Sequence, residues 1–179
     1  MKRILVIGAM LAACFSNGVS AQEVRTVPKV DLAKYVGVWY EIARFPNRFQ
    51  EQCTGNVTAQ YRKRSDGDID VINRCKQKDA STDEAIGRAR VADPATNARL
   101  KVRFAPDWLG WIPFVWADYW IIDLADDYSY AVVGEPSREY LWVLSRSPVL
   151  PDATYDAIVN RATEQGFDTS KLKKTQQDH

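Results

Sequence analysis

The chain is poor in the side chains that activate nucleophiles. Its single histidine is His179, the last residue, so Ser–His–Asp and Cys–His catalysis lack a base. The sequence also has no phosphate-binding glycine loop, no HExxH motif and no CxxC pair. Acid–base work by two carboxylates remains the alternative, although most acids lie in turns such as Asp126-Asp127, where solvation accounts for them. We therefore expect a protein that is not an enzyme and uses no metal or cofactor.

Two residues far apart in the sequence point to packing instead of reaction. Gly37-Val38-Trp39 begins one expected strand, and Arg146 ends a much later one. A guanidinium lying over an indole forms a cation–π pair worth roughly 0.5–2 kcal/mol. Gly37 would let other groups approach closely. We expect Gly37, Trp39 and Arg146 to close the floor of a barrel, with ligand contact as the alternative.

Eight short segments between these residues are expected to be strands, because apolar and polar side chains alternate along them. Turn residues such as Asp66-Gly67 separate them. This spacing predicts an all-β fold, an eight-stranded antiparallel up-and-down barrel that can enclose one small ligand. The expected strands are Val38–Phe45, Asn56–Arg64, Ile69–Lys76, Glu84–Val91, Arg99–Phe104, Ala117–Leu124, Tyr130–Gly134 and Tyr140–Ser145.

Helical patterns occur only before the first expected strand and after the last one. A single turn is expected over Asp31–Val36, closing the barrel floor. Apolar residues from Tyr155 to Ala162 recur at helical spacing and predict one amphipathic α-helix over about 151–165, with Gly166 at its end. Its apolar stripe must lie on the outside of the barrel. Residues 167–179 are expected to form a polar tail that frays.

The first residues are expected to be an export signal. Lys2 and Arg3 precede an apolar stretch over 4–13, which is too short to span a bilayer because that needs about 20 residues. Leu11-Ala12-Ala13-Cys14 fits a lipoprotein signal, which would leave residues 1–13 as the signal and a lipidated Cys14. Val19-Ser20-Ala21 fits ordinary cleavage instead, with a signal of residues 1–21 and a soluble periplasmic or secreted protein. We favour lipidation, with residues 14–30 as anchor and polar arm.

The expected compartment follows from the same segment. Phe15 stands where an Asp would retain a lipoprotein in the inner membrane, so we expect the outer membrane. Removing Lys2 and Arg3 lowers the basic residues from 24 to 22, against 23 acidic ones. A near-neutral chain without a basic stripe is not expected to bind nucleic acid. If Cys14 carries lipid, Cys53 and Cys75 remain as a pair, and we expect a disulfide, with two free buried thiols as the alternative.

On these residues the chain resembles the lipocalin family. Gly37-Val38-Trp39-Tyr40 matches the first lipocalin motif, Asp118-Tyr119 resembles the second with Ala117 in place of Thr, and Arg146 matches the third. The longer phrases over 40–46, 119–124 and 140–146 resemble the bacterial lipocalins, a lipoprotein branch close to apolipoprotein D. The resemblance makes 31–179 the lipocalin domain. It implies storage or transport of a fatty acid or lysophospholipid, and an outer-membrane anchor facing the periplasm.

An apolar cup is expected inside the barrel, lined by side chains on the predicted inward faces. The alternatives are a filled barrel in a structural envelope lipoprotein, or a lipocalin-fold enzyme acting on a lipid. The expected ligand-binding residues are Ala59, Tyr61, Val71, Val102, Phe104, Tyr119, Ile121, Val133, Tyr140 and Trp142.

Two further features leave their roles open. Regular alternation from Trp39 also turns Glu41 and Ala43 inward, and we expect Glu41 to pair with Arg146 or buried water, with a ligand head group as the alternative. The aromatic stretch Trp108–Trp116 joins two strands. It is expected to fold over the barrel mouth as a lid or to form part of the mouth wall. The alternatives are an exposed patch that docks on a second chain, as in a homodimer, or on a membrane.

Overall fold

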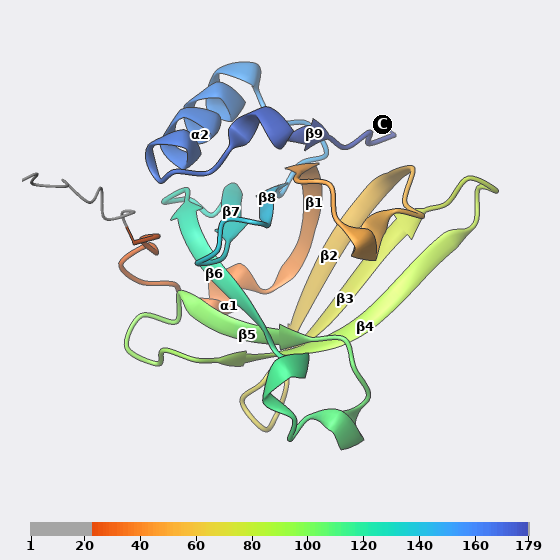
Figure 1. The fold of residues 1–179 in the computed structure, drawn as a ribbon, viewed down its shortest axis with the longest axis vertical. Helices are drawn as coiled ribbons and strands as arrows, with labels where there is room; N and C mark the ends of the chain where they lie inside the picture. The colour runs from red at the N-terminus through yellow and green to blue at the C-terminus, as the bar shows by residue number, and fades with distance from the viewer. Residues whose placement is uncertain (1–22, 179) are drawn as a thin grey trace, which may run out of the picture.

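Eight strands follow one another around a closed barrel in the order in which they occur in the chain. The structure is a computed structural model, and it describes residues 23–178. Each strand pairs antiparallel with the next, and β1 pairs with both β2 and β8, which closes the ring (Figure 1). The strands are β1 Gly37–Arg44, β2 Gly55–Lys63, β3 Ile69–Lys76, β4 Thr82–Val91, β5 Arg99–Arg103, β6 Ala117–Leu124, β7 Tyr130–Gly134 and β8 Leu141–Ser145.

The expected all-β barrel is confirmed, and each predicted strand lies within two residues of an observed one. The expected turn before the first strand is α1, Leu32–Tyr35, and Asp31 caps it by accepting from the Ala33 amide. Short 3₁₀ turns complete the connections: η1 Arg48–Gln50, η2 Asp107–Leu109, η3 Pro113–Val115 and η4 Thr169–Lys171.

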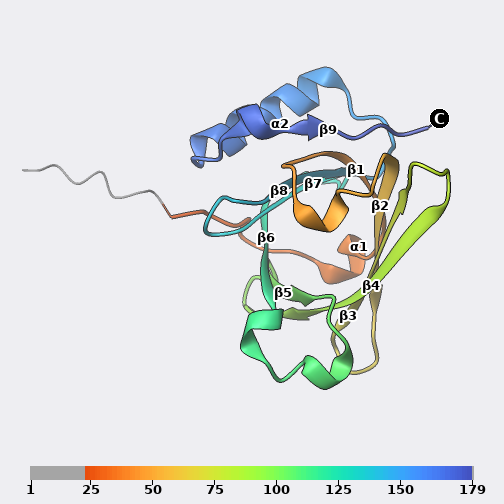
Figure 2. The same cartoon turned by 45° about the vertical axis from the view of Figure 1, so that its right-hand side comes forward.

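The predicted C-terminal helix is α2, Asp152–Glu164, and it packs on the outside of the barrel (Figure 2). Ile158 and Ala162 are its buried residues. They join a second apolar core with outward-facing residues of β1, β6, β7 and β8. Gly166 follows the helix with a φ of +84°, a left-handed conformation that glycine adopts without strain. The barrel interior forms the other core, so the wall of β1 and β6–β8 is covered on both faces.

A β-bulge interrupts β1 between Glu41 and Ala43. The extra residue shifts the alternation, so the prediction that Ala43 points inward is wrong. Ala43 is fully buried against the outer core instead, together with Ile42. Beyond the bulge Arg44 pairs in register with Trp142 of β8. Glu41 and Arg44 can therefore share one face of β1, which a regular strand does not allow three residues apart.

The expected fraying tail is also wrong. After η4 the chain forms β9, Lys173–Lys174, which pairs with Ala43 and Arg44 of β1. The next residues lie between β1 and β2: the Thr175 amide donates to the carbonyl of Ile42, and the Asn56 amide donates to the carbonyl of Gln176. Gln177 Nε2 bridges both strands by donating to the carbonyls of Glu41 and Val57, at 2.8 and 3.0 Å. The tail completes the seam where β1 and β2 diverge.

The export signal, the anchor at Cys14 and the residue His179 lie outside the described residues. Within 23–178, no helix has the length and hydrophobicity to cross a membrane.

Candidate functional site

The floor of the barrel is built around Trp39. Its indole is fully buried, and its Nε1 donates to the carbonyl of Tyr35 at 2.8 Å. The Arg146 guanidinium lies 3.7 Å from the centre of the indole, so the predicted cation–π pair is confirmed. Gly37 has a φ of +105°, and a Cβ there would meet Arg146 Nη1 at 3.1 Å. Glycine thus serves both the backbone conformation and the close approach of the arginine.

Arg146 also fastens α1 to the barrel. Nη2 donates to the carbonyls of Lys34, Tyr35 and Val36 at the end of that helix, at 2.7, 3.1 and 3.0 Å. Nη1 donates to the carbonyl of Val38 at 2.8 Å. Carbonyls at a helix C-terminus otherwise lack partners, so a cation is favourable there. Burial lowers the pKa of Arg146 from its ordinary value.

Two buried tyrosines, Tyr35 and Tyr61, and the half-buried Tyr119 lie beside the floor. The Tyr119 hydroxyl forms hydrogen bonds of 2.8 Å with the hydroxyls of Tyr35 and Tyr61. Burial raises the pKa of Tyr61 to about 12 and raises the pKa values of Tyr35 and Tyr119 well above the ordinary one. All three phenols therefore stay neutral over the physiological range. Their hydroxyl groups make the barrel interior polar next to the floor. The predicted cup was apolar and did not include such a polar region.

An ion pair lies where the barrel opens. Glu41 is almost fully buried, and Arg44 Nη1 donates to its Oε1 at 2.7 Å. Thr175 donates to the same oxygen, and Gln50 Nε2 donates to Oε2 at 2.7 Å. The expected pairing of Glu41 with Arg146 is therefore wrong, because the bulge brings Arg44 to the same face. The Nε atom of Arg44 is buried without a hydrogen-bond partner.

The connection between β1 and β2, residues 45–54, covers the mouth. Gln50 Oε1 accepts from Trp142 Nε1 at 3.0 Å, and the Phe49 ring lies 6.0 Å from that of Tyr140. The predicted disulfide between Cys53 and Cys75 is present and joins the connection to β3. A hollow of about 290 Å³ opens here. It is lined by Arg44, Pro46, Asn47, Arg48, Gln50, Glu51 and Cys53, none of which was among the expected ligand-binding residues.

The expected lining residues differ in how deeply they are buried. Tyr61, Val71, Ile121 and Val133 are buried in the barrel core, and Ala59, Val102, Tyr119 and Trp142 are half-buried against it. Tyr140 lies at the rim, where its ring stacks on Trp142 with centroids 5.8 Å apart. Phe104 lies past the end of β5, beside Gly87, and is 46% exposed. Phe104 therefore borders the barrel without being enclosed by it.

Sequence reasoning also missed Asn73. It is in register with Ala59 of β2 and Ala85 of β4, in the row of inward-facing residues that contains Trp39. Its Oδ1 is buried and has no hydrogen-bond partner. The two small neighbours leave room beside this amide. A polar residue on the otherwise apolar inward face of β3 was the signal available in the sequence.

The family model described as a lipocalin-like domain matches residues 30–177, which is nearly all of the described chain. The chain belongs to the lipocalin family. It is 41% identical over 158 residues to temperature-induced lipocalin-1 of Arabidopsis thaliana, covering 87% of this chain and 84% of that one. It is 37% identical over 170 residues to outer membrane lipoprotein Blc of Escherichia coli K12, covering 94% and 92%. Identity to apolipoprotein D of Mus musculus is 33% over 156 residues, covering 82% and 77%.

One end of the aromatic stretch of this lipocalin packs against the outer face of β4. Trp116 stacks on Arg90, with 4.2 Å between the guanidinium and the ring centre, and its Nε1 donates to the carbonyl of Gly110. Arg90 alternates with the buried Ala89, so it stands on the outer face of β4. Trp108 and Trp111 are 73% and 80% exposed. The stretch forms an exposed aromatic surface. Residues 45–54 cover the mouth.

Proposed function

We propose that this lipocalin carries a fatty acid or lysophospholipid, with the acyl chain inside the barrel and the head group at the mouth. The observation that carries the proposal is the change in polarity along the barrel. Apolar side chains such as Val71, Ile121 and Val133 occupy the interior, while Glu41, Arg44 and Gln50 form hydrogen bonds at the mouth. An amphiphile has the same order of polarity along its length.

The mouth supplies groups of both signs to a head group. Arg44 has a buried Nε without a partner, and the exposed Arg48 lines the same hollow. A carboxylate or phosphate would find donors there. The indole N–H of Trp142 is held by Gln50, whose amide a polar ligand could replace. Binding is therefore proposed to exchange the contacts of Gln50 for contacts with the ligand.

Binding of saturated fatty acids from octanoate to stearate tests the acyl-chain part of the proposal. Each buried methylene contributes up to about 0.8 kcal/mol, so affinity should rise with length and level off when the barrel is full. Ala59→Trp should shorten the longest chain that binds well, because Ala59 is half-buried in the inward row beside Trp39. Ile86→Trp, at a position 66% exposed, is the control that should change nothing. Titration calorimetry measures both.

Flat and weak affinities, unaffected by Ala59→Trp, would mean that the barrel is filled and that the protein has a structural role. Mass spectrometry of solvent extracts adds a second measurement. A carrier releases intact lipid after purification, whereas an enzyme acting on the same lipid releases its product.

We place the protein at the periplasmic face of the outer membrane, attached through lipid on Cys14. The position of Cys14 after the apolar stretch supports this location. Further support is that two relatives of this length are named outer membrane lipoprotein Blc, in Escherichia coli and Vibrio cholerae.

A further inference from the structure

Three large side chains of the aromatic stretch are left mostly uncovered by the residues that the structure describes, 23–178. Trp108 is 73% exposed, Trp111 is 80% exposed and Phe114 is 90% exposed. They are spaced three residues apart, and we call them the aromatic row. Scattered apolar residues are ordinary on a protein surface, but a group of adjacent large aromatics marks an interaction site.

The backbone of the stretch sets the direction of the row. Hydrogen bonds from residue i+3 to residue i run along it: the amide of Leu109 donates to Pro106, Gly110 to Asp107, Ile112 to Leu109 and Val115 to Ile112, at 3.0–3.4 Å. In such 3₁₀ geometry a turn contains three residues, so residues three apart lie on one side. Leu109, Ile112 and Val115 form the neighbouring row and are half-buried. The segment thus turns its largest aromatics to solvent and a smaller apolar row inward.

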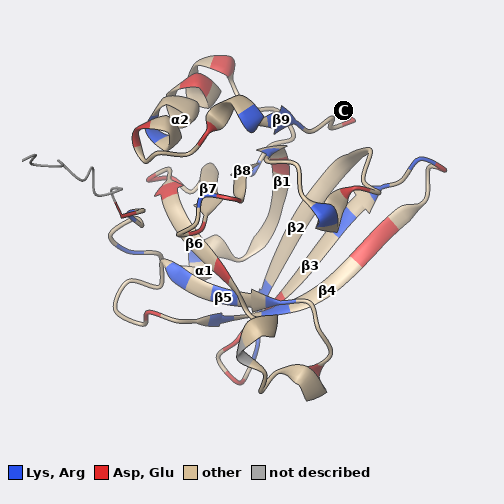
Figure 3. Ribbon diagram, viewed as in Figure 1, with Lys and Arg blue, Asp and Glu red and all other residues tan. Residues whose placement is uncertain are grey.

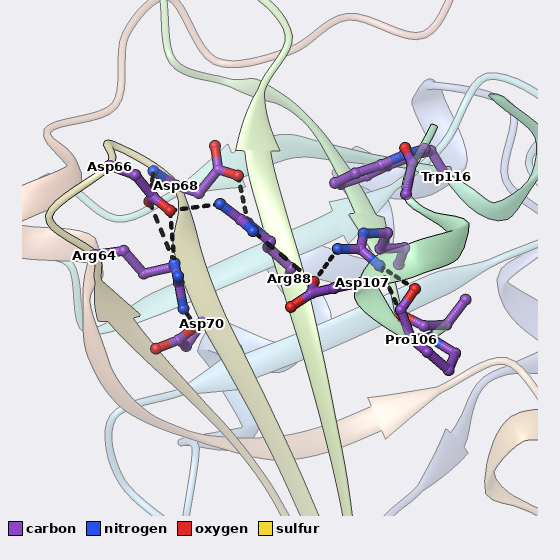
Figure 4. A network of polar contacts seen from close by, with 11 residues as sticks. Arg64, Asp66, Asp68, Asp70, Arg88, Pro106, Asp107 and Trp116 are labelled. Carbon is purple, nitrogen blue, oxygen red and sulfur yellow. Dashed lines mark hydrogen bonds and ion pairs between the residues drawn. The ribbon is translucent and has the colours of Figure 1, made fainter. Parts of the chain in front are cut away.

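The base of the segment is fixed to the barrel wall. Arg103 is 4% exposed, and its Nη1 donates to the carbonyls of Ala105 and Pro106 at 2.8 and 2.7 Å. Its guanidinium also pairs with Asp107 and lies 5.1 Å from the ring centre of Trp116 (Figure 4). A surface that is already ordered loses little conformational entropy when it binds. The aromatic row is therefore a preformed platform.

The platform presents no charge. Residues 108–116 contain no Lys, Arg, Asp or Glu, and they carry neither charge colour in Figure 3. Asp107, at the beginning of the segment, pairs with Arg103 and lies 3.8 Å from Arg88. A protein partner selected by charge would find little to recognise here. Tryptophan is instead the side chain that settles at the boundary between water and acyl chains.

We propose that the aromatic row docks this lipocalin on the surface of a lipid bilayer. The position of the chain's N-terminal end supports the bilayer over other occupants. Glu23, the first described residue, lies 3.6 Å from Arg99 at the beginning of β5 in an ion pair, and the aromatic segment follows the end of β5. The five residues of β5 span about 13 Å.

The tether between Cys14 and Glu23 has a limited reach. Fully extended, it spans at most about 30 Å, so a lipid on Cys14 would hold β5 and the segment after it close to a membrane. The effect of the tether rests on the lipid anchor of the proposed function. The docking of the aromatic row does not require that anchor. The row would then orient the barrel on the bilayer to which the tether attaches it.

Flotation with vesicles of phosphatidylcholine tests the docking without the anchor. The protein used is a shortened chain that begins at Gln22; it lacks Cys14 and retains every strand and helix described here. It should float with the vesicles, and brominated acyl chains should quench its tryptophan fluorescence. Single Ser substitutions at Trp108, Trp111 and Phe114 should each weaken binding about tenfold, or about 1.4 kcal/mol. Because the row is uncharged, added salt or phosphatidylglycerol should change little.

Ile86→Ser is the matched control, because Ile86 is 66% exposed on the outer face of β4 and should not affect flotation. Equal flotation of the wild type and the triple Ser variant overturns the proposal, as does the absence of flotation in both. Self-association that only the triple variant abolishes would assign the row to a second copy of the chain instead. Fatty-acid titration of the triple variant separates the two proposals: affinity should be unchanged if docking and carrying use different surfaces.

Discussion

Arg146 contacts four backbone carbonyls and one indole face at the same time. Only a planar guanidinium with several fixed N–H groups can do this, because the ammonium of lysine is a point charge without a face to stack. The residue therefore joins three parts of the floor: Trp39, the end of α1 and the beginning of β1.

Arg146→Lys should lower the free energy of unfolding by about 1–3 kcal/mol although the charge is kept. Urea unfolding measures the loss, and ligand affinity should stay close to that of the wild type. Arg62→Lys is the control, because Arg62 is exposed and its one hydrogen bond described in this structure is to Gln60. If Arg146→Lys changed ligand preference at unchanged stability, the arginine would belong to the binding site.

The tyrosine cluster predicts a loss of stability in alkali. Because burial raises the pKa of Tyr61 to about 12, from 10.0, the neutral phenol is favoured in the folded state. Its contribution is complete below pH 10 and is lost as the pH rises toward about 12. Tyr119→Phe removes both hydrogen bonds of the cluster and should cost about 1–3 kcal/mol near neutral pH.

Urea unfolding of wild type and Tyr119→Phe at several alkaline pH values measures this effect. The difference between the two proteins should shrink as the pH rises, since the wild type loses what the variant already lacks. A difference that stays constant across this range would show that the phenols do not titrate with unfolding.

Residue types predicted the floor but not the mouth. Gly37, Trp39 and Arg146 could be recognised because each residue type has a particular physical role there. The partner of Glu41 could not, because a bulge of one residue decides which side chains share its face, and nothing in the sequence of 37–44 marks that bulge.

Among the elements, the connection over 45–54 is the one that covers the mouth of the barrel. The Cys53–Cys75 disulfide holds one end of it, and Gln50 and Phe49 contact the rim. Reduction, or replacement of both cysteines by Ala, should lower stability by about 3 kcal/mol in the chain-entropy description. It should also speed the release of a bound fatty acid, because the cover gains freedom.

Stopped-flow displacement of a fluorescent fatty acid measures that release rate. Gln50→Ala in the oxidised protein is the informative companion, since it loosens the cover and keeps the disulfide. If neither change affects release while unfolding becomes easier in the reduced protein, the connection is part of the wall and does not control exit.

The ordered C-terminal tail is an element that the sequence pattern did not predict. Strand alternation and helical spacing reveal elements that bury side chains, as they did for β1–β8 and α2. Residues 173–178 are polar, and they are held by main-chain hydrogen bonds such as that from the Thr175 amide to the Ile42 carbonyl, together with side-chain bonds such as those of Gln177 Nε2. Main-chain hydrogen bonds leave no signature in residue type, so the segment could not be told from a loose end.

For the whole molecule, the fold could be predicted because two features of the sequence lead to the same barrel. One is the number of alternating segments, and the other is the set of lipocalin motifs. Eight alternating segments require a partner for the first and the last, and β1 pairs with β8 as a barrel demands. Attachment to the membrane, in contrast, depends on residues before Glu23 and remains a prediction.

Cys14→Ser tests that attachment. The wild type should enter the membrane fraction with a mass increased by a diacylglycerol on Cys14 and with residues 1–13 removed. Cys14→Ser should be recovered in the soluble fraction. Intact mass of the wild type decides the matter, because an unmodified chain beginning at Gln22 would contradict the lipoprotein hypothesis.

The seam between β1 and β2 has a consequence for the order of synthesis. Gln176 and Gln177, which bridge the two strands, lie more than a hundred residues after the end of β2 at Lys63. β1 must also wait for β8, about a hundred residues later, and such non-local pairing is slow. The barrel of a growing chain therefore cannot be complete until β8 and residues 176–177 have been synthesised. A ligand can be fully enclosed only after that point.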